Sequence, residues 1–352
     1  MVTSAKHAVI IDMGTGMVLL EKDADKKMPT SSMSKVMTAY MVFEALKQDR
    51  VNMDTMLPIS EKSWKKGGSK MFVEVGTRVS VEDLLKGLIV QSGNDAAIAL
   101  AEGLAGDEDT FAKSMTKRAN DLGMKDTQLK NASGWPDPDH YSTANDLALL
   151  AQKLVVDYPH EYALYGMKEF TYAGITQPNR NPLLYRDIGV DGIKTGHTDA
   201  GGYGLMASGE KNGRRVVMVV NGLEDAKARA DESARLMSWA LNGFENIEVV
   251  KVGQTIAQSP TSFAKEDTLK LTVNRDVHVT VPLSEKDNIK TELDYVSPIK
   301  APVKKGQTIG TLNISVPEVG DFKVPLVAAA DLDEAGFIGK AIENIKQMIA
   351  GE

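Results

Sequence analysis

The periodicity of the apolar residues changes near residue 243, and this change constrains the fold of the chain more than any other feature. Between residues 6 and 244, runs of helical character and runs of strand character are mixed. Between residues 247 and 326, nearly every segment alternates apolar with polar residues. A strand repeats every two residues and a helix about every 3.6, so the two parts belong to different fold classes. We expect one domain over residues 1–244 and a second over 245–328.

The first domain is expected to combine an antiparallel sheet with a cluster of helices. The predicted strands cover residues 7–12, 16–21, 204–208 and 214–220, and the predicted helices include 32–48, 96–101 and 226–241. Asn212-Gly213, between the last two strands, is typical of a tight hairpin. Capping patterns at Ser80 and Thr143 predict two more helix starts. Strands, then helices, then strands and a helix are typical of the α+β class.

The alternating segments of the second domain predict a small all-β domain, most naturally a β-sandwich. The clearest strands cover residues 269–273, 277–281 and 322–326. In the remaining segment, residues 329–352, an apolar stripe from Phe337 to Ile349 predicts an amphipathic helix. Two interpretations of this helix are open: an ordinary docking helix and a peripheral contact with a membrane surface.

The charge and composition exclude several classes of function. The chain has 41 Lys and Arg against 48 Asp and Glu, a formal net charge of -7, so no nucleic-acid partner is expected. It has no cysteine, which excludes disulfides, thiol catalysis and cysteine-ligated zinc. Its five histidines form no His-Glu-x-x-His pair, so neither a metal nor a cofactor is expected. The apolar runs are far shorter than the roughly 20 residues of a membrane-spanning helix.

Ser32 and Lys35 are the first candidates for catalysis. They lie three residues apart at the predicted start of a helix, so both side chains project from one face of its first turn. A serine hydroxyl is activated when a neighbouring base takes its proton, and a lysine that burial keeps neutral is such a base. The pattern is weak alone, because Ser-x-x-Lys occurs six times in the chain. Only at Ser32 does it open an apolar helix.

Two further motifs add specificity. A Ser-Gly-Asn sequence begins at Ser92, 60 residues after Ser32, between two apolar runs. Alone, it favours an ordinary capped turn between helices, with Asn94 or Asp95 as the N-cap. A Lys-Thr-Gly sequence begins at Lys194, 162 residues after Ser32, in a strand-like segment. A lysine in such a segment is usually an ordinary exposed strand residue with no function. Each occurs once, and the ordered set of three motifs is far more specific than any one of them.

This ordered set resembles that of the low-molecular-mass penicillin-binding proteins, the serine D-alanyl-D-alanine carboxypeptidases of the penicillin-binding protein 5 and 6 group. The similarity also includes residues 29–38, 91–96, 136–141 and 191–199 and the β-rich C-terminal part, so it covers nearly the whole chain. It implies a penicillin-recognising, β-lactamase-like α+β domain followed by a small all-β domain. The implied ligands are peptidoglycan stem peptides ending in D-Ala-D-Ala and β-lactam antibiotics.

The resemblance implies catalytic roles for three residues. Ser32 would attack the carbonyl of the penultimate D-Ala, and Lys35 would be the general base that receives its proton. Ser92 would relay a proton to the departing D-Ala amine. The resulting acyl-enzyme would then be hydrolysed by water, so that one terminal D-alanine is removed in each cycle.

Several further residues would bind the substrate. Asn94 would orient Lys35 and the peptide bond of the substrate. Lys194 would add positive charge near the nucleophile, and Thr195 would hold the terminal carboxylate. These roles follow from the resemblance.

Three more positions complete the implied site. The backbone N–H groups of Ser32 and His197 would form the oxyanion hole. Arg229 would help to hold the terminal carboxylate, although the group usually has Gly-Arg-Glu where this chain has Ala-Arg-Ala. Arg180 lies where the group has an arginine that lines the cleft, which makes it a candidate contact.

The resemblance also implies a location. We expect a periplasmic protein, peripheral on the outer face of the bacterial inner membrane, with its terminal helix as the contact. The first six residues contain no apolar signal segment, so the residues alone are consistent with either a cytosolic chain or a mature exported chain whose leader has been removed. A role in peptidoglycan maturation and cell shape follows from this location and substrate.

Three alternative functions have recognisable marks. A β-lactamase of class A needs a Glu followed closely by Asn before Lys-Thr-Gly, and neither Glu161 nor Glu169 has such a partner. A hairpin over residues 12–16 resembles the phosphate-binding hairpin of actin-like ATPases and sugar kinases, but an ordinary Gly-Thr-Gly turn explains it equally. A non-catalytic penicillin-sensing protein would keep the motifs without releasing D-Ala.

Overall fold

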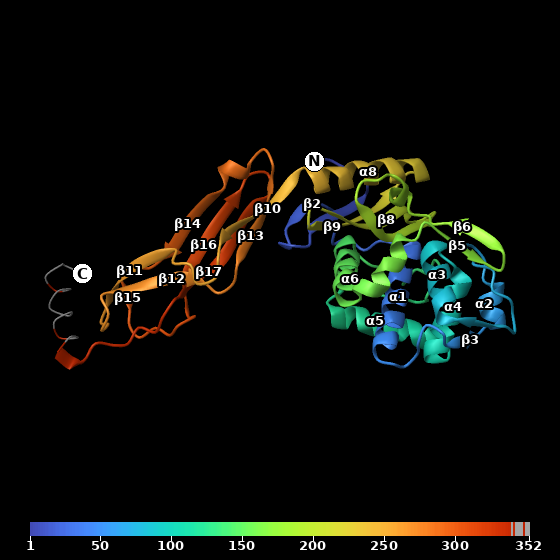
Figure 1. Ribbon diagram of the computed structural model, residues 1–352, viewed down its shortest axis with the longest axis horizontal. Helices are drawn as coiled ribbons and strands as arrows, with labels where there is room; N and C mark the ends of the chain where they lie inside the picture. Colours follow the sequence, from blue (N-terminus) through green and yellow to red (C-terminus); the bar gives the residue numbers. More distant parts are fainter. Residues whose placement is uncertain (339–340, 342–347, 349–352) are drawn as a thin grey trace. The chain divides into compact units, whose positions relative to one another are not determined.

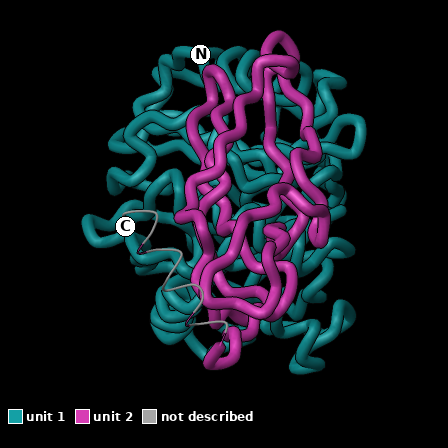
Figure 2. The backbone as a smooth tube through the Cα atoms, turned by 90° about the vertical axis from the view of Figure 1, so that its left-hand side faces the viewer, with its two compact units in different colours: residues 1–242 teal, residues 243–352 magenta. Residues whose placement is uncertain are grey.

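The computed structural model describes residues 1–338, 341 and 348. The chain divides into two compact units, Met1–Asn242 and Gly243–Glu352, which are coloured separately in Figure 2. The first unit contains helices and strands and the second is built from strands (Figure 1). This arrangement confirms the predicted α+β class with a separate all-β part.

A five-stranded antiparallel sheet forms the frame of the first unit, in the order β2-β1-β9-β8-β7. Its strands are β1 (His7–Asp12), β2 (Val18–Lys22), β7 (Val190–Thr198), β8 (Gly202–Lys211) and β9 (Arg214–Leu223). Helix α8 (Ala226–Asn242) packs against β8 and β9, and α6 (Ala144–Asp157) packs against β1 and β9. Because both faces of β9 are covered, residues 216–220 are apolar and buried without alternation.

The remaining helices of this unit gather around α1 (Lys35–Lys47), most of whose residues are buried. They are α2 (Glu61–Lys65), α3 (Val81–Val90), α4 (Asn94–Ala105), α5 (Glu108–Leu122) and α7 (Pro159–Tyr162). The predicted caps of α3 and α6 are confirmed: Ser80 and Thr143 each accept a backbone N–H three residues on, at 3.1 Å. Residues 96–101 of α4 are entirely buried, which explains their small apolar side chains.

Short elements complete the first unit. Strands β3 (Met56–Pro58) and β4 (Arg78–Ser80) pair antiparallel although α2 lies between them in sequence, and β5 (Glu169–Tyr172) and β6 (Ile175–Pro178) form a hairpin. Three 3-10 turns are η1 (Ser31–Ser34), η2 (Ala163–Gly166) and η3 (Pro182–Tyr185). The sequence predicted one helix over residues 32–48, whereas the structure has the tighter η1 turn first and begins α1 at Lys35.

The second unit contains two sheets. Strands β10 (Phe244–Val250) and β13 (Val277–Pro282) pair antiparallel, and a six-stranded sheet has the order β14-β16-β17-β12-β11-β15. Its strands are β11 (Ala257–Ser262), β12 (Thr268–Val273), β14 (Lys290–Tyr295), β15 (Ile299–Lys300), β16 (Thr308–Val316) and β17 (Gly320–Ala328); a short 3-10 turn, η4 (Lys286–Asn288), precedes β14. Buried residues of β12 and β17, such as Leu271 and Leu326, form a core with residues 299–303.

The predicted terminal helix falls mostly on residues 339–340, 342–347 and 349–352, which lie outside the described residues, and the membrane contact proposed for it falls there too. Phe337 and Ile338, just before them, are exposed. Within the described part of the chain, no helix has both the length and the apolar character needed to cross a membrane.

Candidate active site

The fold brings Ser32 and Lys35 to a meeting point of η1, the start of α4 and the loop after Ala132. The Lys35 side chain is 1% exposed and its Nζ lies 2.9 Å from Ser32 Oγ. Nζ also donates to Asn94 Oδ1 at 2.7 Å and to the carbonyl oxygen of Ser133 at 2.7 Å. Two groups that are distant in sequence, Asn94 and Ser133, therefore hold the amine beside the Ser32 hydroxyl.

Burial is the main determinant of the charge on this amine. The pKa of Lys35 is lowered to about 7, mainly by burial and also by the neighbouring Arg180 and Lys66 charges, whereas Asp95 opposes this shift. A neutral amine has two N–H groups and one lone pair. Asn94 and Ser133 accept the two N–H groups, which leaves the lone pair for the Ser32 hydroxyl. The arrangement can accept a proton from Ser32.

Asn94, the first residue of α4, is fixed from both ends of its side chain. Its Oδ1 accepts from Lys35, and its Nδ2 donates to the carbonyl oxygen of Gly67 at 2.8 Å. Its backbone N–H donates to the carbonyl oxygen of Ser69 at 2.7 Å. The amide orientation is thereby set, with the oxygen toward the Lys35 amine.

The neighbouring Asp95 fastens the segment after Ser69 to α4. Its carboxylate is fully buried and accepts backbone N–H groups of Met71, Phe72 and Val73 at 2.9–3.3 Å. A buried carboxylate needs such donors. The signal in the sequence is an acidic residue inside an apolar run.

Ser92 lies in the break between α3 and α4, with a positive φ of 59°. The side chain is 1% exposed, and its hydroxyl has no hydrogen-bond partner among the residues that the structure describes. The N-cap residue of α4 is Gly93, which forms no side-chain cap. The interpretation of this motif as a side-chain-capped turn is therefore wrong. A buried hydroxyl with unused hydrogen-bonding capacity is suited to a transient partner.

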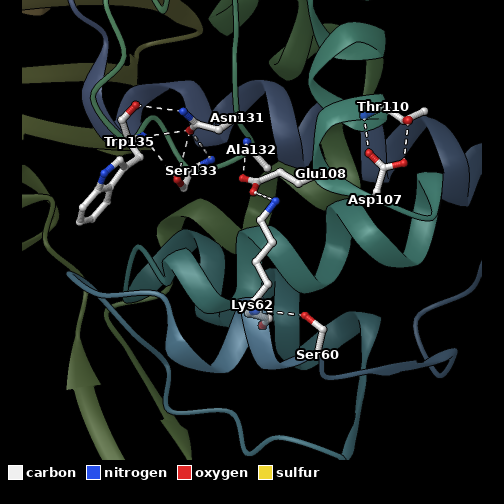
Figure 3. Close-up of polar contacts among 10 residues, drawn as sticks. Ser60, Lys62, Asp107, Glu108, Thr110, Asn131, Ala132, Ser133 and Trp135 are labelled. Atoms are coloured by element: carbon white, nitrogen blue, oxygen red, sulfur yellow. Dashed lines mark hydrogen bonds and ion pairs between the residues drawn. The ribbon is translucent and has the colours of Figure 1, made fainter.

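The loop that presents the Ser133 carbonyl group is held by its own polar network (Figure 3). Asn131 Oδ1 accepts the backbone N–H groups of Ser133 at 3.2 Å and Trp135 at 2.9 Å. The buried Glu108 accepts the N–H of Ala132 at 3.1 Å, and Lys62 pairs with Glu108 at 2.8 Å. The Trp135 ring extends away from this network. Lys35 thus contacts a preformed acceptor, which the sequence motifs did not reveal.

Strand β7 supplies the third motif and lies at the edge of the five-stranded sheet. Lys194 and Thr195 are buried. Burial lowers the pKa of Lys194 well below its ordinary value, and the charges of Lys35, Arg180 and Arg229 lower it further. Gly196 allows β7 to approach η1, since a Cβ there would lie 3.0 Å from the carbonyl oxygen of Thr30.

The exposed His197 ring stacks on Tyr203, with ring centroids 3.9 Å apart. The Arg229 guanidinium lies 5.5 Å from the centroid of the same Tyr203 ring. Arg180 donates a hydrogen bond to Ser69. Burial lowers the pKa of both arginines, and Arg180 also lowers that of Arg229. The predicted site residues thus surround one cationic region, which is suited to an anionic ligand group.

A cavity of about 270 Å³ opens beside the nucleophile, and we call it the Ser32 cavity. Its walls include Ser32, Asn94, Trp135, His197 and Asp199. Among the residues that the structure describes, no cluster of three or more His, Asp or Glu side chains could hold a metal ion. The cavity walls therefore bring the Ser32 hydroxyl together with the polar side chains of Asn94, His197 and Asp199.

Comparison with known proteins identifies the family. Residues 2–225 match the model of the family described as D-alanyl-D-alanine carboxypeptidase, and residues 244–334 match that of the penicillin-binding protein 5 C-terminal domain. The chain belongs to the D-alanyl-D-alanine carboxypeptidase family. The resemblance inferred from the three motifs is thereby confirmed.

The similarity to individual members extends over both units. The chain is 38% identical to D-alanyl-D-alanine carboxypeptidase DacA of Escherichia coli K12, covering 98% of this chain and 87% of that one. It superposes on penicillin-binding protein 5 of Haemophilus influenzae with a TM-score of 0.82, 34% identity and coverage of 95% and 99%. It also superposes on cefotaxime-bound penicillin-binding protein D2 of Listeria monocytogenes, with a TM-score of 0.62, 33% identity and coverage of 67% and 97%.

Proposed function

We propose that this serine-type D-Ala-D-Ala carboxypeptidase removes the terminal D-alanine of peptidoglycan pentapeptides with Ser32, Lys35 and Ser92 as its catalytic residues. The observation that carries this assignment is the 2.9 Å contact between Lys35 Nζ and Ser32 Oγ, at an amine whose pKa burial lowers to about 7. Such an amine is half neutral near pH 7 and can act as a base there.

The first step forms an acyl-enzyme. Ser32 Oγ attacks the carbonyl carbon of the penultimate D-Ala while its proton passes to Lys35 Nζ. The oxyanion accepts hydrogen bonds from the backbone N–H groups of Ser32 and His197. The C–N bond then breaks, and the departing amine takes a proton through the Ser92 hydroxyl. The unpartnered hydroxyl of Ser92 supports this relay, because it is free to bond both groups in turn.

The terminal carboxylate selects the substrate. One carboxylate would be held by a hydroxyl and two cationic groups. The hydroxyl is that of Thr195, and the cationic groups are those of Lys194 and Arg229. Arg180 adds positive charge to the same region. Because an internal residue of a peptide lacks this carboxylate, the enzyme would remove a single terminal residue. Water then hydrolyses the ester and restores Ser32.

β-Lactams would acylate Ser32 in the same way, and the resulting acyl-enzyme would be hydrolysed slowly. The cefotaxime-bound Listeria structure supports a β-lactam as a ligand of this fold. The alternative, a β-lactamase, lacks support, because neither Glu161 nor Glu169 is followed by the required Asn. The nucleotide-binding alternative also lacks support, because Asp12 of that hairpin is buried and paired with Arg214 at 2.8 Å.

The wider role proposed for the protein follows from its substrate. We assign the catalytic domain to residues 1–244, a β-rich stalk to 245–328 and a peripheral inner-membrane contact to 329–352, on the periplasmic side. Trimming of stem peptides there would contribute to peptidoglycan maturation and cell shape. Family membership over both units supports this assignment.

Labelling with a fluorescent penicillin tests the nucleophile. Ser32→Ala should abolish covalent labelling and D-Ala release from a pentapeptide. Ser114→Ala is the matched control, because Ser114 belongs to another Ser-x-x-Lys sequence but lies on the exposed face of α5. It should label like the parent. Equal labelling of Ser32→Ala and the parent would refute the assignment, and labelling without D-Ala release in the parent would favour a penicillin sensor.

A further inference from the structure

His140 is a buried titratable side chain that has no part in the reaction described above. It is 5% exposed and follows the loop that presents the Ser133 carbonyl group. The backbone N–H of Lys130 donates to His140 Nδ1 at 3.1 Å, and His140 Nε2 lies 2.7 Å from Ser34 Oγ. One imidazole ring therefore joins the base of this loop to the η1 turn that contains Ser32.

The contacts of the ring define where its proton lies. A backbone N–H group can only donate, so Nδ1 of His140 is the nitrogen without a proton. The pKa of His140 is lowered to about 4, mainly by burial and also by the Lys35 charge, whereas Asp137 opposes this shift. The ring is therefore neutral near pH 7, and its single proton is on Nε2, which donates to Ser34 Oγ.

Two hydroxyl groups extend this hydrogen bonding across η1. Ser34 Oγ lies 2.5 Å from Thr30 Oγ1, and a hydroxyl that accepts from His140 can donate its own proton to Thr30. Thr30 and Ser34 occupy the N-cap positions of η1 and α1, where Ser and Thr side chains usually cap the helix. Neither side chain forms such a cap here. Both buried hydroxyls instead bond to each other, and Ser34 also bonds to His140.

We propose that His140 is a positioning residue, which holds the Ser32 hydroxyl and the Lys35 amine in the arrangement that allows proton transfer between them. This inference rests on the proposed function, because Ser32 is taken as the nucleophile. It deepens that function by adding a residue outside the three motifs that acts on the reaction through Ser34.

The backbone beside the nucleophile requires such support. Ser31 has a positive φ of 51°, a conformation that a non-glycine residue keeps only where its surroundings impose it. Thr30 and Ser34 bracket Ser31 and Ser32, so the hydrogen bond between their side chains closes the turn. A displacement of reacting groups by about 1 Å can slow a reaction about 100-fold. Loss of the His140 donor should therefore slow acylation without removing any group that reacts.

The other nitrogen of the ring acts on the base rather than on the nucleophile. By accepting from Lys130, Nδ1 closes the loop of residues 130–140. This loop supplies the Ser133 carbonyl oxygen that accepts from Lys35. His140 thus contacts both the turn that carries the hydroxyl and the loop that holds the amine, so a single ring keeps the two reacting groups in place.

Two substitutions separate the two nitrogens of the ring. The amide nitrogen of His140→Gln can replace the Nε2 donor to Ser34, whereas His140→Asn can replace only the Nδ1 acceptor. Stopped-flow acylation by a fluorescent penicillin measures the acylation rate constant and the dissociation constant of the initial complex separately. His140→Asn should lower the rate constant about 30-fold and leave the dissociation constant within about twofold. His140→Gln should keep the rate constant within about fivefold. His160→Asn is the control, because His160 is exposed, and it should react like the parent.

Ser34→Ala tests whether His140 acts through Ser34. It should slow acylation as His140→Asn does, and the double variant should be no slower than either single variant, because both substitutions break the same link. Poor folding would lower the amplitude of labelling but not the rate constant of the molecules that react.

Three results would refute the inference. The first is a parental rate constant in His140→Asn, whether or not its amplitude falls. The second is a His140→Gln variant that is as slow as His140→Asn. The third is a double variant in which the effects of His140→Asn and Ser34→Ala multiply. A parent that does not react with penicillin would instead refute the proposed function.

Discussion

The pH dependence of acylation is the sharpest prediction of this structure, because one buried amine sets it. Lys35 must be neutral to take the Ser32 proton, and its pKa is about 7. The neutral fraction is then about 9% at pH 6 and about 91% at pH 8. The acylation rate should therefore rise about tenfold between these values and level off above them.

A charge substitution should move this acid limb in a defined direction. Arg180 is the largest charge effect on the pKa of Lys35 and lowers it. Arg180→Gln removes that repulsion, so the limb should move to higher pH. Arg186→Gln is the matched control, since Arg186 pairs with Asp231 and is not among the groups that shift the Lys35 pKa. It should leave the limb in place.

Stopped-flow acylation by a fluorescent penicillin between pH 5.5 and 9 measures both variants directly. The apparent pKa of the limb, rather than the plateau rate, is the decisive quantity, because Arg180→Gln is also expected to weaken ligand binding. A flat profile over this range would show that proton transfer to Lys35 does not limit acylation. A rate that still rises about tenfold per pH unit at pH 9 would show that the amine is not desolvated as the structure indicates.

Two further predictions concern backbone contact and buried charge. Gly134→Ala should slow acylation about 100-fold, because the added Cβ would lie 1.8 Å from the carbonyl oxygen of Ser31, beside the nucleophile. Gly16→Ala is the control, because Gly16 also has a left-handed backbone but open space around it, and this variant should acylate normally. Normal acylation by both variants would contradict the prediction. Arg214→Met should lower the free energy of unfolding, measured in urea, by about 3–5 kcal/mol, because it leaves the buried Asp12 carboxylate without its cation. An unchanged urea midpoint would show that the Asp12–Arg214 pair does not stabilise the fold.

The sequence indicated candidate side chains for the site better than it indicated their contacts. Ser32, Lys35, Asn94 and Lys194 carry their chemistry in the side chain, so their order along the chain was enough to propose them as a set. The third partner of Lys35 is a backbone carbonyl group, at Ser133. Backbone groups are the same in every residue, and only the fold decides which of them reaches the amine.

The local geometry at the nucleophile also escaped sequence reasoning. Helical spacing extends back to Ser32, yet the backbone there is the η1 turn, and Ser31 has a positive φ of 51°. Its carbonyl group contacts the backbone of Gly134, a residue about 100 positions away whose close approach no local pattern records. Tertiary packing, rather than helix propensity, therefore sets the start of α1.

Burial of Lys35 connects the stability of the fold with its chemistry. The pKa of Lys35 is about 7 in the folded chain, against an ordinary value of 10.5. Between pH 7 and pH 10.5, the unfolded chain therefore binds a proton that the folded chain lacks. Stability should therefore rise with pH through this window. The difference of about 3.5 units corresponds to about 5 kcal/mol of stability that is absent below pH 7. The buried faces of α1 and α4 must offset this loss, so the apolar packing around the amine is also what keeps it neutral enough to act as a base.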